Sequence, residues 1–365
     1  MNKFKFQELK EEENFDPQKI CKKNCEDVPF TQSNFYGNWQ KKLGRVVRRF
    51  LIYSDNEIIA YFQIIKYPLL FKKNYLYIPY GPVVKDFFLR SDLFEFPRSD
   101  LRKKSDDFFI NLKQKLTEIA KTENAIFVRL DFTPFISNDI LSKFFTKAKF
   151  FTYRSAHFQP RTEWLVNLEE SEENLLKAMH EKTRYSIHLA ERKGITAEII
   201  TENFEKYFEI FYKLISETAQ RDKFNLHPKN YYENIFHNLS QNLLGKSFLT
   251  IVKHEQNPQI LAINLIIVFG KTATHIFSGS SDEKKSLRPT YLARWKAMCY
   301  AKKIGCTYSS FGGIASQKNN IYKSWEGLTT FKKRFGGQEL NHSDFFDVVV
   351  NPIWYFMYNV YKIMR

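Results

Sequence analysis

One order of elements is expected twice in this chain, and it constrains the fold more than any other feature. The second copy opens with three extended runs that are apolar or alternate apolar with polar residues: Phe248–His254, Gln259–Phe269 and Thr272–Ser281. A helix over Pro289–Lys303 begins with a proline, which suits a first helical position. The short strand Thr307–Phe311 follows. The order is therefore βββαβ.

The first copy has the same order with little shared sequence. Three strands are expected over Val46–Tyr53, Ile58–Lys66 and Tyr75–Ile78, followed by a helix over Asp106–Lys121, with Ser105 as its cap, and a strand over Ala125–Leu130. An antiparallel meander followed by a helix that crosses to a parallel strand is typical of acyltransferase sheets.

We therefore predict an α+β fold of two tandem GNAT-like (acyl-CoA N-acyltransferase-type) βββαβ domains packed together, with facing clefts. The first domain is expected to comprise residues 1–158 plus 338–365, and the second residues 159–337. Ser171–Gly194 is expected to form one helical segment with a cationic stripe that includes Arg184. Thr330–Gly337 is expected to form a basic, glycine-closed hairpin. An aromatic helix over Ile353–Arg365, too short to span a bilayer, is expected to pack on the first domain rather than on a membrane.

The chain is basic, with 56 Lys and Arg against 40 Asp and Glu among 365 residues, a formal net charge of +16. Such an excess is consistent with a polyanionic partner: nucleic acid, a phosphorylated substrate or an anionic membrane. AT-rich codon usage would produce the same excess, so charge alone does not establish the partner.

Metal and membrane signals are weak. Cys21 and Cys25 form a single C-x₃-C pair with no second pair at metal spacing, so no metal site is expected. No apolar run reaches the length of a membrane span, and the first residues lack an apolar signal region. We expect a cytoplasmic protein, with peripheral contact at the inner membrane face left open.

The sequence lacks the glycine-containing loop with which related folds bind coenzyme A. Acetyl-coenzyme A enzymes with this sheet hold the pyrophosphate on a glycine-containing loop before the main helix. The corresponding loops here, Asp282–Arg288 and Arg90–Lys104, contain no glycine. A different acyl donor and no bound cofactor are therefore expected.

Several segments, in order, resemble one known family. They are Gln32-Ser33…Gly44, Tyr77-Ile78-Pro79-Tyr80-Gly81-Pro82-Val83, Gln159-Pro160…Thr162, Lys182-Thr183-Arg184-Tyr185…Gly194-Ile195, Arg221-Asp222-x-Phe224, Phe311-x-Gly313-Ile314 and Phe331-Lys332…Gly336-Gly337. They are similar to the FemABX peptidoglycan-bridge aminoacyltransferases, also called lipid II:glycine glycyltransferases. Ser171–Leu243 leaves no room for the family's coiled-coil arm, so the chain resembles the armless, FemX-like members. Ser310 stands where the family usually has aspartate.

The resemblance implies transfer of an amino acid from aminoacyl-tRNA to the stem-peptide amine of a peptidoglycan precursor, either lipid II or UDP-MurNAc-pentapeptide. We expect Lys332 to lie beside the tRNA 3′ end, with its ammonium near the developing oxyanion or a phosphate. The substrate-binding residues that the resemblance implies are Tyr80, Arg184, Tyr185, Arg221 and Phe331. Lys333 and Arg334 would contact the tRNA acceptor stem. No general base is apparent in these motifs.

Two alternatives remain at this point. A coenzyme A-dependent N-acyltransferase would keep the fold and use a small acyl thioester. A non-catalytic RNA-binding protein would use only the positive charge. Acceptance of acetyl-coenzyme A would favour the first, and a Lys332→Ala variant altered only in RNA affinity would favour the second.

Overall fold

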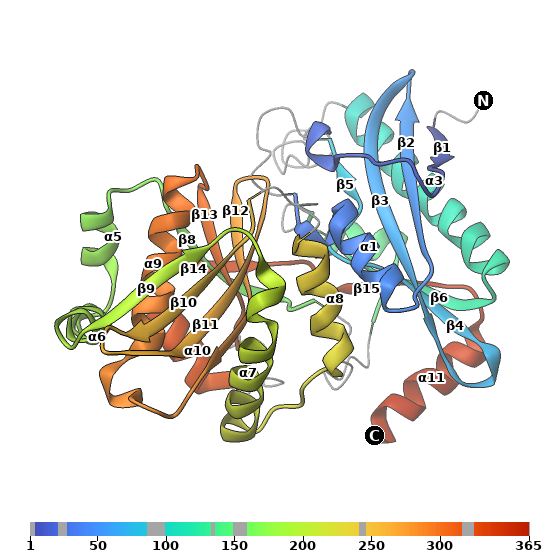
Figure 1. Cartoon of the computed structure of the whole chain (residues 1–365). Coiled ribbons are helices and arrows are strands. Elements are labelled where there is room, and N and C mark those ends of the chain that lie inside the picture. Colours follow the sequence, from blue (N-terminus) through green and yellow to red (C-terminus); the bar gives the residue numbers. More distant parts are fainter. Residues whose placement is uncertain are drawn as a thin grey trace. The chain divides into compact units, whose positions relative to one another are not determined.

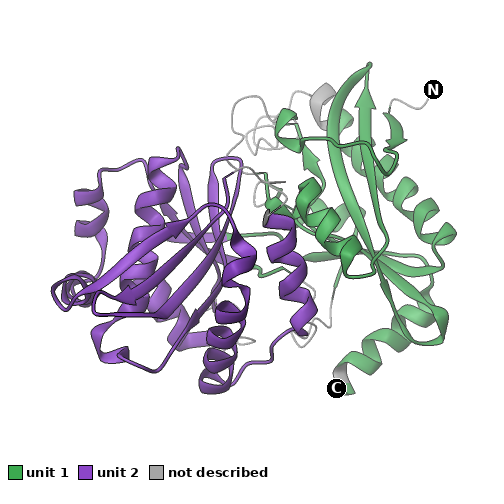
Figure 2. Ribbon diagram, viewed as in Figure 1, with its two compact units in different colours: residues 1–161, 341–365 green, residues 162–340 purple. Residues whose placement is uncertain are grey.

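The computed structural model describes residues 4–20, 28–85, 99–132, 136–148, 159–240, 246–315 and 325–364 (Figure 1). Cys21 and Cys25 lie outside these ranges, as do residues 90–98 of the loop Arg90–Lys104. The chain divides into two compact units (Figure 2). Unit 1 comprises Met1–Arg161 and Asn341–Arg365, and unit 2 comprises Thr162–Leu340.

Unit 1 is built on a mixed sheet with the order β1-β2-β3-β4-β6-β15-β7, and β5 pairs with β3. Only β4 and β6 run parallel among these neighbours. The strands are β1 (Phe4–Glu8), β2 (Val47–Ser54), β3 (Glu57–Pro68), β4 (Asn74–Ile78), β5 (Val83–Val84), β6 (Ala125–Asp131), β7 (Thr146–Lys147) and β15 (Phe345–Val349). The α-helices are α1 (Asn34–Lys42), α3 (Ser99–Thr122), α4 (Asn138–Phe144) and α11 (Pro352–Met364).

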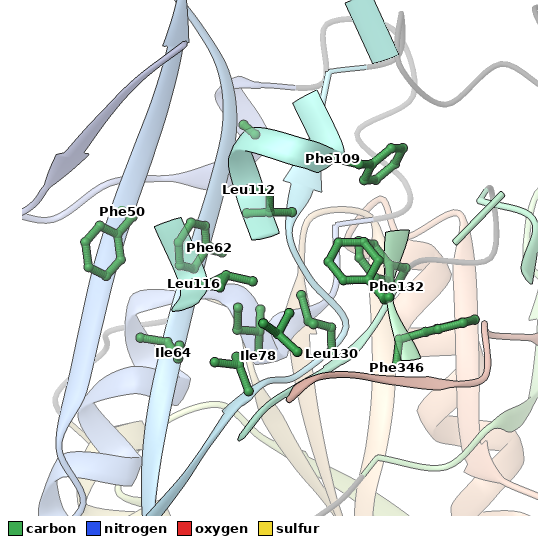
Figure 3. Close-up of a cluster of buried hydrophobic side chains, with 14 of the residues drawn as sticks. Phe50, Phe62, Ile64, Ile78, Phe109, Leu112, Leu116, Leu130, Phe132 and Phe346 are labelled. Atoms are coloured by element: carbon green, nitrogen blue, oxygen red, sulfur yellow. The ribbon is translucent and has the colours of Figure 1, made fainter. Parts of the chain in front are cut away.

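The core of unit 1 lies between α3 and the sheet (Figure 3). Phe109, Leu112 and Leu116 recur at helical spacing and are fully buried against strand residues such as Ile78 and Leu130. Burying each such side chain contributes about 1.5–3 kcal/mol. The expected cap at Ser105 is wrong, because α3 begins at Ser99 and Ser105 lies buried inside the helix.

Unit 2 has the corresponding sheet, with the order β14-β8-β13-β12-β11-β10-β9. Its strands are β8 (Thr162–Asn167), β9 (Ile195–Ile200), β10 (Phe248–His254), β11 (Asn257–Phe269), β12 (Thr272–Ser280), β13 (Tyr308–Gly313) and β14 (Gln338–Asn341). Its α-helices are α5 (Glu172–Ala178), α6 (Glu181–Arg192), α7 (Phe208–Asp222), α8 (Lys229–Ser240), α9 (Pro289–Lys303) and α10 (Glu326–Lys333).

The βββαβ order therefore occurs in both units, as β2-β3-β4-α3-β6 and as β10-β11-β12-α9-β13. In each unit the helix crosses from the third strand to a parallel fourth strand. This confirms the predicted fold of two GNAT-like βββαβ units. Within the described part of unit 2, α7 and α8 are ordinary helices and no long helical arm is present.

Two expected elements of unit 2 are wrong. The helical segment over Ser171–Gly194 breaks at Met179 and His180, where the chain turns extended and the His180 side chain caps α6. The cationic stripe is therefore divided between two helices. The expected hairpin at Thr330–Gly337 is instead the end of α10 followed by a turn. Leu328 and Phe331, three residues apart, share one face of this helix. Phe335 lies just past the end of α10, where its ring contacts Phe331 with centroids 5.2 Å apart.

Candidate functional site

The two parallel strands at the centre of unit 2 separate part-way along their length. β12 pairs with β13 over Thr272–Thr274 and Tyr308–Ser310. β12 then continues to Ser280 beside β11, whereas β13 continues to Gly313 beside β8. No further pairing joins the two strands within the described residues. Polar side chains from both strands, from α9 and from α10 gather at this point of separation.

Lys332 is the central cation of this group. Its side chain is only 7% exposed, and Nζ donates a hydrogen bond of 2.6 Å to the carbonyl oxygen of Gly313. Burial and the positive charge of Arg294 lower the pKa of Lys332 to about 7, and the carboxylate of Glu163 opposes this shift. Near neutral pH the amine therefore exchanges readily between its charged and neutral forms.

The end of α10 is held closely against the sheet, and this fixes the position of Lys332. Gly337 has φ +100°, and a Cβ built there would lie 2.3 Å from the carbonyl oxygen of Leu165 on β8. Only glycine permits both the backbone conformation and the close approach. The indole nitrogen of Trp164 also donates to the carbonyl oxygen of Gly336 at 2.6 Å. The Gly336-Gly337 pair thus lets α10 end directly beside β8.

Arg294, on α9, is the second buried cation. Its guanidinium carbon lies 4.7 Å from the centre of the Phe311 ring, and Nη2 makes a weak hydrogen bond of 3.4 Å to Ser278. Nη1 is buried and has no hydrogen-bond partner within the described part of the chain. Burial lowers the pKa of Arg294 to about 9. A buried donor without an acceptor is costly unless a ligand supplies one.

His275 and Ser278 on β12 reach the same group because of a local irregularity. Ile276 has no Cα partner on β11, so one extra residue stands between His275 and Phe277. The His275 ring lies 5.0 Å from Phe311, and Nε2 is 3.1 Å from the Ser309 hydroxyl. Burial, with the charges of Arg294 and Lys332, holds the pKa of His275 well below its usual range. The imidazole is therefore neutral.

The carboxylate that acts on Lys332 comes from β8. Glu163 accepts a hydrogen bond of 2.8 Å from the hydroxyl of Ser310 and attracts the Lys332 ammonium. With Lys332 and Arg294 charged, the group has an excess of positive charge. Such a group favours an anionic ligand, or a reaction in which negative charge develops on an oxygen. It can donate hydrogen bonds and hold a proton.

Unit 1 contains a second polar cluster, which joins two of the sequence motifs. Gln32 donates through Nε2 to the carbonyl oxygen of Pro79 at 2.6 Å and accepts from the backbone N–H of Gln63 at 2.9 Å. Asp131 accepts from the Tyr77 hydroxyl and from the Tyr80 backbone N–H, both at 2.6 Å. Burial raises the pKa of Asp131 to about 8, although both hydrogen bonds oppose the shift. This cluster fixes the conformation of the Pro79–Pro82 loop.

Comparison with known proteins identifies the family of the chain. The FemAB family matches residues 19–246 and 245–362, which is most of the chain. The chain belongs to the FemAB family. It is 21% identical to a lipid II:glycine glycyltransferase of Staphylococcus aureus over 91% of this chain and 93% of that protein. It is 21% identical to one from Staphylococcus saprophyticus over 86% of each. A crystal structure of FemX superposes with a TM-score of 0.76 at 18% identity, covering 97% of this chain and 100% of that one.

Tyr80, which belongs to the family-like segment Tyr77–Val83, is buried in unit 1. Its φ is +50°, its ring stacks on His342 with centroids 4.0 Å apart, and its hydroxyl donates to the carbonyl oxygen of Pro160. Its side chain therefore already has a packed position. A role for Tyr80 in stem-peptide binding stays a prediction.

Two of the predicted substrate-binding arginines already have partners within unit 2. Arg184 donates to the backbone carbonyl oxygens of Lys177 and Met179, so it caps the end of α5. Arg221 bonds to Asp222 and Asp282 and to the Ser280 carbonyl oxygen. Both sets of contacts are those of structural arginines, and an anion at Arg221 would compete with two carboxylates. Binding of a precursor phosphate there stays a prediction.

The other predicted residues lie on exposed or half-buried surfaces of unit 2. Tyr185 is largely exposed on α6. Phe331 packs edge to face on Tyr291 and Phe335. Lys333 forms an ion pair of 2.6 Å with Glu339, and Arg334 is half-buried at the end of α10. Lys332 alone among the predicted residues lies in the buried cationic group.

Sequence reasoning missed Arg294 and His275. Arg294 follows Tyr291 by three positions and precedes Met298 by four, so it interrupts an apolar stripe of α9. An arginine at an apolar position of a helix could have identified Arg294 as a candidate site residue. His275 carried no signal, because the strand pattern alone does not reveal the extra residue at Ile276.

Neither a metal cluster nor a membrane-spanning helix occurs in the part of the chain that the structure describes. Within those ranges no three His, Cys, Asp or Glu side chains are grouped as a metal site would require. No helix there has the length and apolar character needed to cross a membrane.

Proposed function

We propose that this protein is an aminoacyltransferase that moves an amino acid from aminoacyl-tRNA to the stem-peptide amine of a peptidoglycan precursor. The family membership and the lipid II:glycine glycyltransferases among its relatives support this proposal. The observation that carries it is the buried Lys332 ammonium, 2.6 Å from the Gly313 carbonyl oxygen, beside an arginine with an unused donor.

The proposed reaction is aminolysis of an ester. The precursor amine loses a proton and attacks the carbonyl carbon of the aminoacyl ester, which forms a C–N bond and a tetrahedral oxyanion. Collapse of this intermediate breaks the C–O bond to the ribose, and the ribose oxygen takes up a proton. The products are an amide on the stem peptide and free tRNA.

In this proposal Lys332 donates a hydrogen bond to the tetrahedral oxyanion, and Arg294 supplies a second positive charge nearby. A donor directed at a developing oxyanion contributes about 2.7–4 kcal/mol to catalysis. The ester is already activated, so alignment of the amine and stabilisation of the oxyanion are the main requirements. Lys333 and Arg334, close to Lys332 on the chain, would contact the acceptor stem of the tRNA.

The acceptor and peripheral contact with the inner membrane face belong to the same proposal. Lipid II would present the stem peptide at a bilayer, whereas UDP-MurNAc-pentapeptide would present it in solution. The relatives named for lipid II favour the lipid-linked form.

The deciding experiment incubates the protein with a pool of radiolabelled aminoacyl-tRNAs and with each precursor in turn, followed by mass analysis of the product. A precursor heavier by one aminoacyl residue is expected, and its formation should fall strongly in Lys332→Ala. Lys253→Ala is the matched control, because Lys253 is an exposed lysine of unit 2 paired with Glu198. Turnover with acetyl-coenzyme A but not with charged tRNA would refute the proposal.

A further inference from the structure

Helix α11 of unit 1 is apolar on two opposite sides. One side packs on the sheet: Tyr358 is buried, its ring lies 5.0 Å from Phe127, and the Tyr355 hydroxyl donates to Asp347 at 2.6 Å. The predicted packing of this helix on the first domain is thus confirmed. That side accounts for the attachment of α11 but not for its remaining apolar residues.

The opposite side of α11 is exposed. Ile353 is 75% exposed, Phe356 69% and Met364 83%, and the intervening positions Met357 and Val360 are also exposed. Ile353, Met357, Val360 and Met364 follow one another at spacings of three and four, and Phe356 lies beside them, so they form one continuous stripe along the helix. A stripe of this kind is rarely left in water.

The stripe continues onto a second segment of unit 1. The turn between β3 and β4 presents Leu70 and Phe71, which are 64% and 74% exposed. The Phe71 ring contacts Trp354 of α11 with centroids 5.6 Å apart. Two segments far apart in the sequence thus form one apolar surface, here called the α11 face.

The two segments that form the α11 face carry lysines and no acidic residues. Lys73 lies 5.6 Å from the Trp354 ring, and Lys72 is exposed beside Phe71. Residues 66–78 and 350–364 contain no Asp or Glu. An apolar stripe beside Trp354, in segments that contain lysines and no acidic residues, matches the boundary between acyl chains and anionic headgroups.

We propose that the α11 face docks unit 1 onto an anionic lipid bilayer, with α11 lying in the plane of the interface. The exposed stripe would enter the acyl boundary, while Lys72 and Lys73 contact the headgroup phosphates. Docking would bring the protein to the surface that carries a lipid-linked precursor. The docking itself does not depend on the proposed transferase reaction.

The test is flotation of the full chain with vesicles of phosphatidylcholine, with and without phosphatidylglycerol. Binding to the vesicles that contain phosphatidylglycerol is expected, and it should weaken as salt is added. The double variant Ile353→Ser with Phe356→Ser should lower the partition coefficient by on the order of tenfold or more. Lys72→Gln with Lys73→Gln should lower it by about fivefold for each charge removed.

The matched control lies on α3 of the same unit. Ile110 is an exposed apolar residue and Lys113 an exposed lysine, both outside the α11 face. Ile110→Ser with Lys113→Gln should bind vesicles as the unchanged protein does. Equal loss of binding in this control and in the α11 variants would overturn the proposal, as would the absence of binding by the unchanged protein.

Two further measurements distinguish membrane docking from self-association and from the transferase reaction. If the α11 face joins two copies of the chain, sedimentation without lipid will show a dimer that becomes a monomer in Ile353→Ser with Phe356→Ser. That result would overturn membrane docking. Transfer to UDP-MurNAc-pentapeptide in solution should be unchanged in this variant, whereas transfer to lipid II in vesicles should fall. A protein that binds vesicles but transfers nothing would refute the transferase proposal alone.

Discussion

Replacing Lys332 by methionine should stabilise the protein and abolish most of its activity. Methionine has a similar length and flexibility, so it fills the same space without the charge. The structure allows both effects to be estimated, because the Lys332 amine is buried, has one identified hydrogen bond and lies close to another cation.

The gain in stability follows from the pKa of Lys332. A lysine whose pKa falls from 10.5 to about 7 on folding carries a cost of about 5 kcal/mol when it is charged in the folded state. The variant also leaves the Gly313 carbonyl oxygen without its hydrogen bond, which costs about 1–3 kcal/mol. The free energy of unfolding should therefore rise by about 2–4 kcal/mol at or below neutral pH.

The pH dependence has a definite sign. Between about pH 7 and pH 10.5 the unfolded lysine binds a proton that the folded one has released. Lys332 therefore makes the folded protein more stable as pH rises through this window. Lys332→Met removes this slope, so its advantage should be largest at pH 6 to 7, fall by about 1.4 kcal/mol per pH unit above that, and disappear between about pH 8.5 and 10.

The loss of activity follows from the proposed oxyanion contact. Without this donor, kcat/KM for aminoacyl transfer should fall by about 10²–10³-fold. In the unchanged protein kcat/KM should also decline as pH rises through about 7, because the free enzyme then loses the ammonium. Lys332→Arg keeps its charge at every pH in this range and should lack that decline.

The assays are thermal unfolding between pH 6 and 10 and single-turnover transfer at matched pH. Lys253→Met serves as control, since an exposed lysine should change stability by less than about 0.5 kcal/mol. If Lys332→Met lowers the melting temperature at pH 6 to 7, or if it keeps near-full turnover while folded, the reasoning about this amine is wrong.

Three other substitutions test separate parts of the structure. Arg294→Gln should lower kcat by about tenfold or more with little change in KM; a loss confined to KM would argue for a purely binding role. Gln32→Ala removes two buried hydrogen bonds in unit 1 and should lower the free energy of urea unfolding by about 1–3 kcal/mol, and an unchanged midpoint would contradict this. Gly337→Ala should destabilise unit 2 by more than about 1 kcal/mol, because its Cβ meets backbone; hydrogen exchange of α10 as slow as in the unchanged protein would refute this.

The repeated βββαβ order could be predicted from the sequence because it rests on local signals. The strand Phe248–His254 and the helix Pro289–Lys303 were predicted with the bounds that the structure has. Both are long, strongly patterned elements, and α9 also carries a proline at its first position. Pattern and propensity agree in these elements, and tertiary packing did not need to override them.

The wrong secondary-structure predictions lie where tertiary contacts determine the local conformation. The break between α5 and α6 depends on His180, whose side chain caps α6 and whose backbone N–H donates to the carbonyl oxygen of Arg334 across unit 2. Periodicity does not report such a contact. The end of α10 was mistaken for a hairpin because Gly336 and Gly337 suggested a turn between strands, whereas they serve to bring the helix against Leu165.

The candidate site was only partly predictable for the same reason. Lys332 was predicted because its segment resembles a family motif. Its burial and its closeness to Arg294 could not be predicted, because they arise only where α9, α10 and β13 meet at the separation of β12 and β13. The point at which two parallel strands stop pairing depends on the register and twist of the sheet, which cannot be read from a local residue pattern.

The contrast between Arg129 and Arg294, both buried, supports the proposal that the chemistry lies in unit 2. In unit 1, Arg129 donates two hydrogen bonds to Asp347, whose carboxylate raises the pKa of Arg129 despite burial. In unit 2, Arg294 has no such carboxylate among the described residues and keeps an unused donor. A buried ion pair can often be replaced by apolar residues without loss of stability. A buried cation without a carboxylate partner destabilises the folded protein, and an anionic ligand would offset that cost. Arg129→Met with Asp347→Leu should therefore leave transfer within about twofold, and the Tyr355 hydroxyl should lose its acceptor at a cost of about 1–3 kcal/mol in stability. If this double variant instead lost as much transfer activity as Arg294→Gln while remaining folded, unit 1 would share in the chemistry and the assignment to unit 2 would fail.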